Sequence, residues 1–170
     1  MEEIEVPTEH LTEEINEKAE EIYEKKEKWT LLVAISTAIM AVLAAIAGLL
    51  AGHHSNEALI QQIKSSDQWA FYQAKSIKAT IRAMQPATFT DKTPDQVKAE
   101  EEGIKTKAEG FEKDSEFHLQ KHIVLSKAVT LLQISIAISA ISILTRRRFL
   151  WVVGMATALT GAGFLIYGII

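Results

Sequence analysis

Three long apolar segments alternate with charged segments along the chain. The segments Ile123–Leu144 and Phe149–Ile170 each exceed the roughly 20 residues that a helix needs to cross the hydrocarbon core of a bilayer. Only residues 145–148 separate them, so they are predicted to cross as an antiparallel pair. Trp29–Ala51 is a third segment of this kind, and Trp29 suits the aromatic belt at a membrane interface.

Helical periodicity continues between the first and second crossings, over residues 52–122. In its first half, residues recur at steps of three and four in a mostly apolar stripe with one acid: Ile60, Ile63, Asp67, Ala70, Ala74, Ile77, Ile81 and Met84. Pro86 should end this helix, because the residue before a proline is disfavoured in the helical region. Residues 86–93 are therefore predicted to form a turn.

The second half of this region starts with Thr93-Pro94-Asp95-Gln96, the pattern of a capping box with proline at the first helical position. A second stripe follows at helical spacing: Val97, Ile104, Ala108, Phe111, Ser115, His118 and His122. The two stripes predict an antiparallel coiled-coil hairpin. If Gln85 lies opposite Pro94, the numbers of opposed residues sum to about 179.

Residues 1–28 form an acidic segment, with eleven Glu and four Lys. The order of residues does not match a signal peptide, which needs a basic start and a short apolar core. Pro7-Thr8 suits a helix start, and the apolar stripe that follows predicts an amphipathic helix. Because surface-bound membrane helices normally carry Lys and Arg, we expect either a protein partner for this helix, such as another copy, or a helix that is solvated by water.

The expected fold is an all-α membrane protein. It has three transmembrane helices, with an extramembrane antiparallel helical hairpin over 52–122 between the first and second. The arginines Arg146, Arg147 and Arg148 lie between the last two crossings, and Lys-rich or Arg-rich loops stay cytoplasmic. We therefore expect the bacterial inner membrane, with the N-terminus cytoplasmic and both the hairpin and the C-terminus outside.

The first crossing carries a stripe of small residues at spacings of four and three. Its members are Ala34, Ala38, Ala41, Ala45, Gly48 and Gly52. Small residues let helix backbones approach closely, which is how helices associate in lipid. The stripe predicts self-association into a homo-oligomer.

Histidines are the candidate metal ligands, because the chain has no Cys and four of its five His form two clusters. An antiparallel hairpin would gather His54, His118 and His122 near the outer membrane edge, with Glu57 as a candidate oxygen ligand. Imidazole and carboxylate suit a divalent ion such as zinc. The same cluster without metal could sense pH, and the alternative is that these histidines have neither role.

No other chemistry is indicated. The His118–His122 spacing matches a zinc-protease helix, but Leu119 stands where the catalytic Glu belongs. Phosphate-loop and nucleophile-elbow patterns are missing from the sequence. The net charge of −4 and the lack of a basic cluster with interleaved aromatics argue against nucleic-acid binding. We therefore expect no enzyme and no resident cofactor.

Three segments resemble one known family: Glu5-Val6-Pro7-Thr8-Glu9-His10, Ala51-Gly52-His53-His54-Ser55-Asn56-Glu57-Ala58, and the stretch from Ser65 to Lys78 that contains Asp67-Gln68-Trp69-Ala70. The chain is similar to the bacterial membrane-protein family numbered 4337 among the domains of unknown function. The resemblance implies a membrane protein and supplies no catalytic residue.

The favoured function is an oligomeric integral membrane scaffold or interaction protein whose partners are the lipid bilayer and other copies of itself. One alternative is a homo-oligomeric channel or transporter subunit, because Thr130, Gln133, Ser135, Ser139 and Ser142 give the second crossing a polar face. The other is a metal- or pH-sensing module built on the histidines. No charge lies at the centre of any predicted crossing, where the charges that mark ion paths stand, so this observation does not support the channel.

Overall fold

A computed structural model describes residues 8–84 and 93–170, which form three helices: α1 (Thr8–Ala83), α2 (Pro94–Thr145) and α3 (Arg148–Ile169). Within those ranges there is no strand, so the all-helical prediction is confirmed there. The opening residues 1–7 and most of the predicted turn, residues 85–92, lie outside the described part.

The length of α1 follows from where the prolines stand. Pro7, Pro86 and Pro94 are the only prolines of the chain, and each lies just before, just after or at the first position of a helix. Because a proline inside a helix removes a hydrogen bond and clashes with the preceding turn, a proline-free stretch can stay helical throughout. The acidic segment, the first apolar segment and the first arm of the hairpin are accordingly one helix of 76 residues.

The start of α2 has the predicted cap. Thr93 is extended, Pro94 occupies the first helical position, and the backbone N–H of Thr93 donates to Gln96 Oε1 at 3.1 Å. This is one half of a capping box, which satisfies a donor that the helix itself leaves open.

A tight turn joins α2 to α3 at the arginines. Arg146 has left-handed backbone angles, with φ 54° and ψ 28°, and its N–H donates to the Ile143 carbonyl. The N–H of Arg147 donates to the Ser142 carbonyl, so two of the last four carbonyls of α2 have partners in the turn. The turn falls within a residue of the predicted 145–148.

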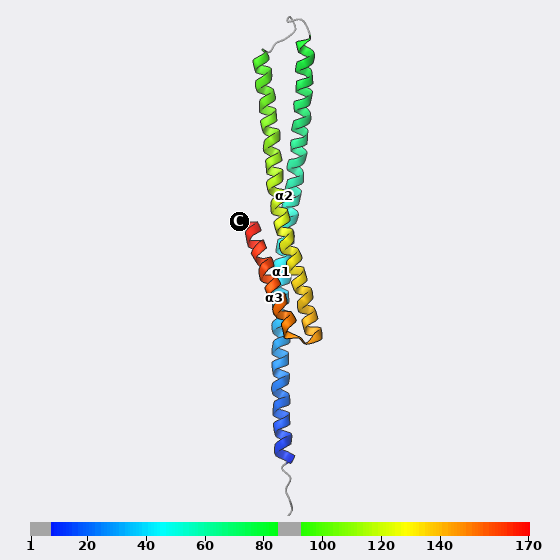
Figure 1. Cartoon of the computed structure of the whole chain (residues 1–170), viewed down its shortest axis with the longest axis vertical. Helices are drawn as coiled ribbons and strands as arrows, with labels where there is room; N and C mark the ends of the chain where they lie inside the picture. The colour runs from blue at the N-terminus through cyan, green and yellow to red at the C-terminus, as the bar shows by residue number, and fades with distance from the viewer. Residues whose placement is uncertain (1–7, 85–92) are drawn as a thin grey trace, which may run out of the picture.

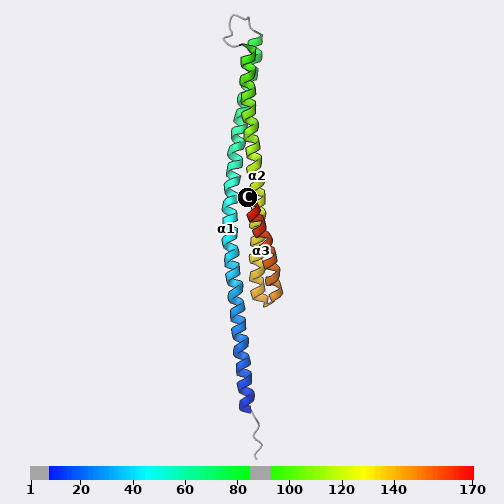
Figure 2. The ribbon, with the colours of Figure 1, turned by 90° about the vertical axis from the view of Figure 1, so that its left-hand side faces the viewer.

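The helices are arranged with α2 in the middle. It runs antiparallel to both α1 and α3, whereas α1 and α3 barely touch (Figures 1 and 2). The N-terminal part of α1 extends past the α2–α3 turn with no other helix beside it in either view. At the opposite end, α1 and α2 extend beyond α3 as a pair.

All three helices are long and apolar enough to cross a membrane. Ala47, Leu125 and Leu165, one from each helix, belong to one buried cluster. Nearer the turn, Trp151 Nε1 on α3 donates to Ser36 Oγ on α1 at 3.2 Å. The three segments therefore form a single apolar layer.

Glycines allow α3 to lie very close to α2. A Cβ added to Gly161 would meet Leu132 Cγ at 3.1 Å and the Ala128 carbonyl at 3.3 Å, and one added to Gly168 would meet Leu125 Cδ2 at 2.7 Å. Close backbone approach through small residues is the usual way for helices to associate in lipid.

In the hairpin, the stripe predicted for α2 is confirmed and the stripe predicted for α1 is wrong. Ile104, Ala108 and Ser115 are buried against α1. The eight residues of the other stripe are all exposed, seven in α1 and Met84 just after its end: Ile60, Ile63, Asp67, Ala70, Ala74, Ile77, Ile81 and Met84. The face of α1 that is buried carries smaller residues, Ala58 and Ser65, because they allow α2 to approach more closely.

Candidate functional site

Two reciprocal hydrogen bonds between serines and carbonyls show the register of the hairpin. Ser65 Oγ on α1 donates to the Ala108 carbonyl at 3.1 Å, and Ser115 Oγ on α2 donates to the Ala58 carbonyl at 2.8 Å. The residue numbers of both pairs sum to 173. The predicted sum of about 179 is therefore wrong by six residues, because close approach of small residues sets the register, whereas the prediction extrapolated from the turn.

This register brings His54 and His118 into contact at the base of the hairpin. Their Nδ1 atoms lie 2.9 Å apart and their ring centroids 5.1 Å apart. One Nδ1 must carry the hydrogen and the other must accept it. His53 lies beside His54, with 5.5 Å between ring centroids, and Phe117 meets His118 edge-on at 5.5 Å.

His122 has different partners from those two histidines. Its Nδ1–H donates to the Ala51 carbonyl at 2.8 Å, across the interface between α2 and α1. Its Nε2 is 3.5 Å from Ser126 Oγ, one turn further along α2. The bond to Ala51 uses the ring nitrogen that faces α1, so it holds His122 away from the His54–His118 pair.

The structure does not bring the four predicted metal ligands together as one set. His54 and His118 contact each other, whereas His122 is bonded to Ala51, and Glu57 makes no described bond to any of them. In residues 8–84 and 93–170 no three His, Cys, Asp or Glu side chains are placed to hold a metal ion. The six-residue difference in register explains this, because the predicted set relied on His122 facing Glu57.

The surroundings of His54 favour its neutral form. Partial burial lowers the pKa of His54 by desolvating the imidazolium, and the positive charges of His118, His53 and Lys121 lower it further. Glu57 acts in the opposite direction and raises the pKa. The hydrogen bond between His54 and His118 therefore forms at pH values at which at least one of the two rings is neutral.

The predicted self-association stripe lies on a free face of α1 within the single chain. Its six residues, Ala34, Ala38, Ala41, Ala45, Gly48 and Gly52, are all exposed. A Cβ added to Gly48 or Gly52 would meet no atom within 4 Å. The arginines Arg146, Arg147 and Arg148 are likewise exposed, at the α2–α3 turn.

The serine face of α2 lies between helices. Ser135, Ser139 and Ser142 have no exposed surface, and Gly154 of α3 lies directly against Ser139. Ser135 and Ser142 donate to carbonyls of their own helix, at 2.7 Å each. In the single chain these three serines are covered by packing, whereas Thr130 and Gln133, the other two residues of the predicted polar face, are exposed.

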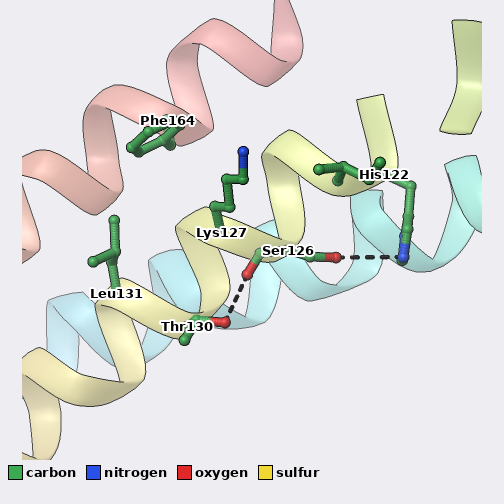
Figure 3. Close-up of a pocket in the computed structure, with 7 residues that line it drawn as sticks. His122, Ser126, Lys127, Thr130, Leu131 and Phe164 are labelled. Atoms are coloured by element: carbon green, nitrogen blue, oxygen red, sulfur yellow. Dashed lines mark hydrogen bonds between the residues drawn. The ribbon is translucent and has the colours of Figure 1, made fainter. Parts of the chain in front are cut away.

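A groove of about 500 Å³ lies between α2 and α3 at the end of the apolar layer nearest the hairpin (Figure 3). Leu131 and the ring of Phe164 form apolar parts of its wall, and Lys127 rises from α2 between Phe164 and His122. The sequence indicates Lys127 only as a lysine near a membrane edge. The groove depends on where α3 packs, so no local pattern predicts it.

One family model matches residues 29–93 and 85–170, and its description is "Domain of unknown function (DUF4337)". The chain belongs to this family. The match confirms the resemblance seen in the sequence, and the two matched regions meet at the connection between α1 and α2. No curated protein and no solved structure matches the chain.

Proposed function

We propose that this member of the DUF4337 family is an oligomeric scaffold of the bacterial inner membrane, without catalytic chemistry of its own. The three apolar segments cross the bilayer, and the α1–α2 pair outside it is a coiled-coil hairpin. Buried positions seven residues apart, such as Ala51, Ala58 and Ser65, support the coiled coil.

The observation that carries this proposal is the exposed face of α1. At about 100° per residue, the small-residue stripe and the aliphatic stripe of the hairpin arm fall on the same side of the helix. In the hairpin arm, Ile63, Ile77 and Ile81 are 54%, 62% and 55% exposed. Lipid can cover the part of this face that lies in the bilayer, but water cannot solvate the aliphatic part favourably. An exposed and mostly apolar face of this kind, interrupted at Asp67, marks an interaction site.

A second copy of the chain is the partner that fits this face. The partner must offer small residues at membrane depth and aliphatic residues beyond the membrane, on one helix that continues through both. α1 has that composition itself, through Gly48 in the apolar layer and Ile63 in the hairpin. All copies share one orientation in the membrane, so two such faces meet in matching register.

The test compares two glycines that have no neighbour within 4 Å of an added Cβ. Gly48→Leu changes the proposed interface, and Gly163→Leu changes the exposed side of α3. Overpacking typically costs about 1–3 kcal/mol per site, so Gly48→Leu should lower the particle mass measured by light scattering in nanodiscs. Gly163→Leu should leave the mass at the wild-type value. Equal masses for all three proteins would contradict self-association through α1.

The orientation is the second part of the proposal. Lys28, near the start of the apolar part of α1, and the arginine turn lie at the same end of the apolar layer, which supports a cytoplasmic position for both. The chain has no cysteine, so single cysteines report accessibility cleanly. In intact cells a membrane-impermeant maleimide should label Thr106→Cys and leave Glu20→Cys unlabelled. The reverse pattern would invert the orientation.

A pH-responsive role is the second candidate, and the His54–His118 contact is the observation that favours it. The hydrogen bond between the two Nδ1 atoms requires a free lone pair on one of them. Protonating both rings places two N–H groups face to face and breaks the contact. Acidification should then loosen the base of the hairpin, which is where the membrane part and the external part of the scaffold meet.

A further inference from the structure

The groove between α2 and α3 contains a lysine inside the apolar segment of α2. Lys127 is four residues beyond Ile123, which places its Cα about 6 Å into that segment. An ammonium group at such a depth is costly unless its stem reaches outward or an anion accompanies it. In the described part of the chain, no carboxylate lies within ion-pairing distance of Lys127.

The hydroxyl groups beside this lysine are already engaged. Thr130 Oγ1 donates to the Ser126 carbonyl at 2.9 Å. Ser126 Oγ lies 3.5 Å from His122 Nε2, and the other nitrogen of that ring donates to Ala51. The uncommitted donors of the groove are therefore those of Lys127, so a bound anion is recognised mainly by its charge.

The rest of the groove suits a hydrocarbon chain. Leu131 and Phe164 line it further into the apolar layer, and Figure 3 shows Lys127 between Phe164 and the His122 end. A molecule with an anionic group at the Lys127 level and an apolar tail directed into the layer matches this order. Membrane phospholipids have this construction, with the charge at the interface and the acyl chains below it.

We propose that this groove binds one phospholipid with an anionic headgroup, with the headgroup phosphate against Lys127 and an acyl chain along Leu131 and Phe164. The attraction between one lysine and an anionic headgroup should make binding of an anionic lipid about five times stronger than binding of a zwitterionic lipid. The inference depends on membrane insertion and is independent of self-association, because every lining residue belongs to one chain.

The test reconstitutes the full chain in bilayers of equal parts phosphatidylglycerol and phosphatidylcholine and counts retained lipids by native mass spectrometry after gentle detergent extraction. The wild type should retain phosphatidylglycerol about five times more often than phosphatidylcholine. Lys127→Gln should bring the two lipids close to parity, and Lys127→Arg should keep the preference. Thr130→Trp should remove both lipids, because its ring fills the groove from an exposed position.

Lys113→Gln is the matched control, because it removes the same charge from an exposed site on the hairpin. It should keep the wild-type preference. A wild type that retains both lipids equally, or a Lys127→Gln variant that keeps the full preference, would overturn the proposal. The same spectra report subunit number, and a preference that persists in monomeric Gly48→Leu protein would separate the lipid site from the scaffold proposal.

Discussion

On α2 the predicted apolar stripe of the hairpin faces α1, although Phe117 and Leu119 beside it are exposed, whereas on α1 the large aliphatic residues of the hairpin face away from α2. Ile104 on α2 is 9% exposed, and Ile63 on α1 is 54% exposed. α1 instead buries Ala58 and Ser65, which make close contact with α2. A single chain therefore covers the predicted apolar stripe of the α2 arm and leaves the predicted stripe of the α1 arm exposed. We take the open surface as the place where further copies join.

The sharpest test of this difference places the same charge on each arm. Ile104→Asp buries a carboxylate that has no partner, and we expect it to destabilise the hairpin by about 3 kcal/mol or more. Ile63→Asp should leave the hairpin folded and reduce assembly. Limited proteolysis of the full chain measures the first effect and particle mass the second. Equal protease sensitivity in the two variants would mean that the two arms do not differ in this way.

Within the apolar layer, α2 is again the covered helix, because α3 lies against it. Gly161→Leu would collide with Leu132 and the Ala128 backbone, and overpacking of this kind costs about 1–3 kcal/mol. We expect α3 to separate partly from α2, with faster hydrogen exchange in both. Gly163→Leu, two residues away and without neighbours, is the control. Unchanged exchange in the Gly161 variant would show that α2 does not need this cover.

The polar contacts between the two arms of the hairpin should contribute less to its stability than the apolar packing between them. Ser65→Ala and Ser115→Ala each remove one serine–carbonyl hydrogen bond, and the net loss should be about 0.5–1.5 kcal/mol. The carbonyls remain in their helices, so neither change leaves an isolated polar group. Hydrogen exchange of the hairpin reports the loss. A loss of stability as large as that caused by Ile104→Asp would mean that these hydrogen bonds, and not the apolar contacts, mainly hold the two arms together.

The smallest expected effect is the response of the hairpin base to pH. Because the pKa of His54 is lowered in the folded chain, mainly by burial, the unfolded state binds more protons once the pH falls below the ordinary value near 6.5. Stability at this site is therefore fully present above about pH 6.5 and declines as the pH falls through that value towards the lower pKa of the folded chain. Proteolysis near the base should accelerate on acidification.

Two neighbouring histidines provide the comparison for that experiment. His54→Gln should remove most of the acid sensitivity, whereas His53→Gln, at an exposed position beside it, should keep it. Lys121 and Glu57 face His54 as well, and their charges act on the pKa of His54 in opposite directions, Lys121 lowering it and Glu57 raising it. If the His54→Gln protein responds to acid as the wild type does, the pair does not control the base of the hairpin.

Local features of the sequence were enough to predict the ends of the helices and the apolar layer. Pro86 and Pro94 bracket the connection between α1 and α2, Thr93 and Gln96 give the start of α2, and the arginines give the turn before α3. These features act through backbone geometry and capping within a few residues. The length and the apolar composition of the three segments together determined that each helix can cross a membrane.

Tertiary structure decided which face of α1 turns inward and how the helices align lengthwise. The periodicity of α1 marks an aliphatic face, but small residues on another face let α2 approach closely enough for Ser65 and Ser115 to reach opposing carbonyls. The same alignment pairs His54 with His118, and the packing of α3 creates the groove beside Lys127. These features depend on contacts between residues far apart in the chain. A periodic pattern within one helix carries no information about the energies of such contacts.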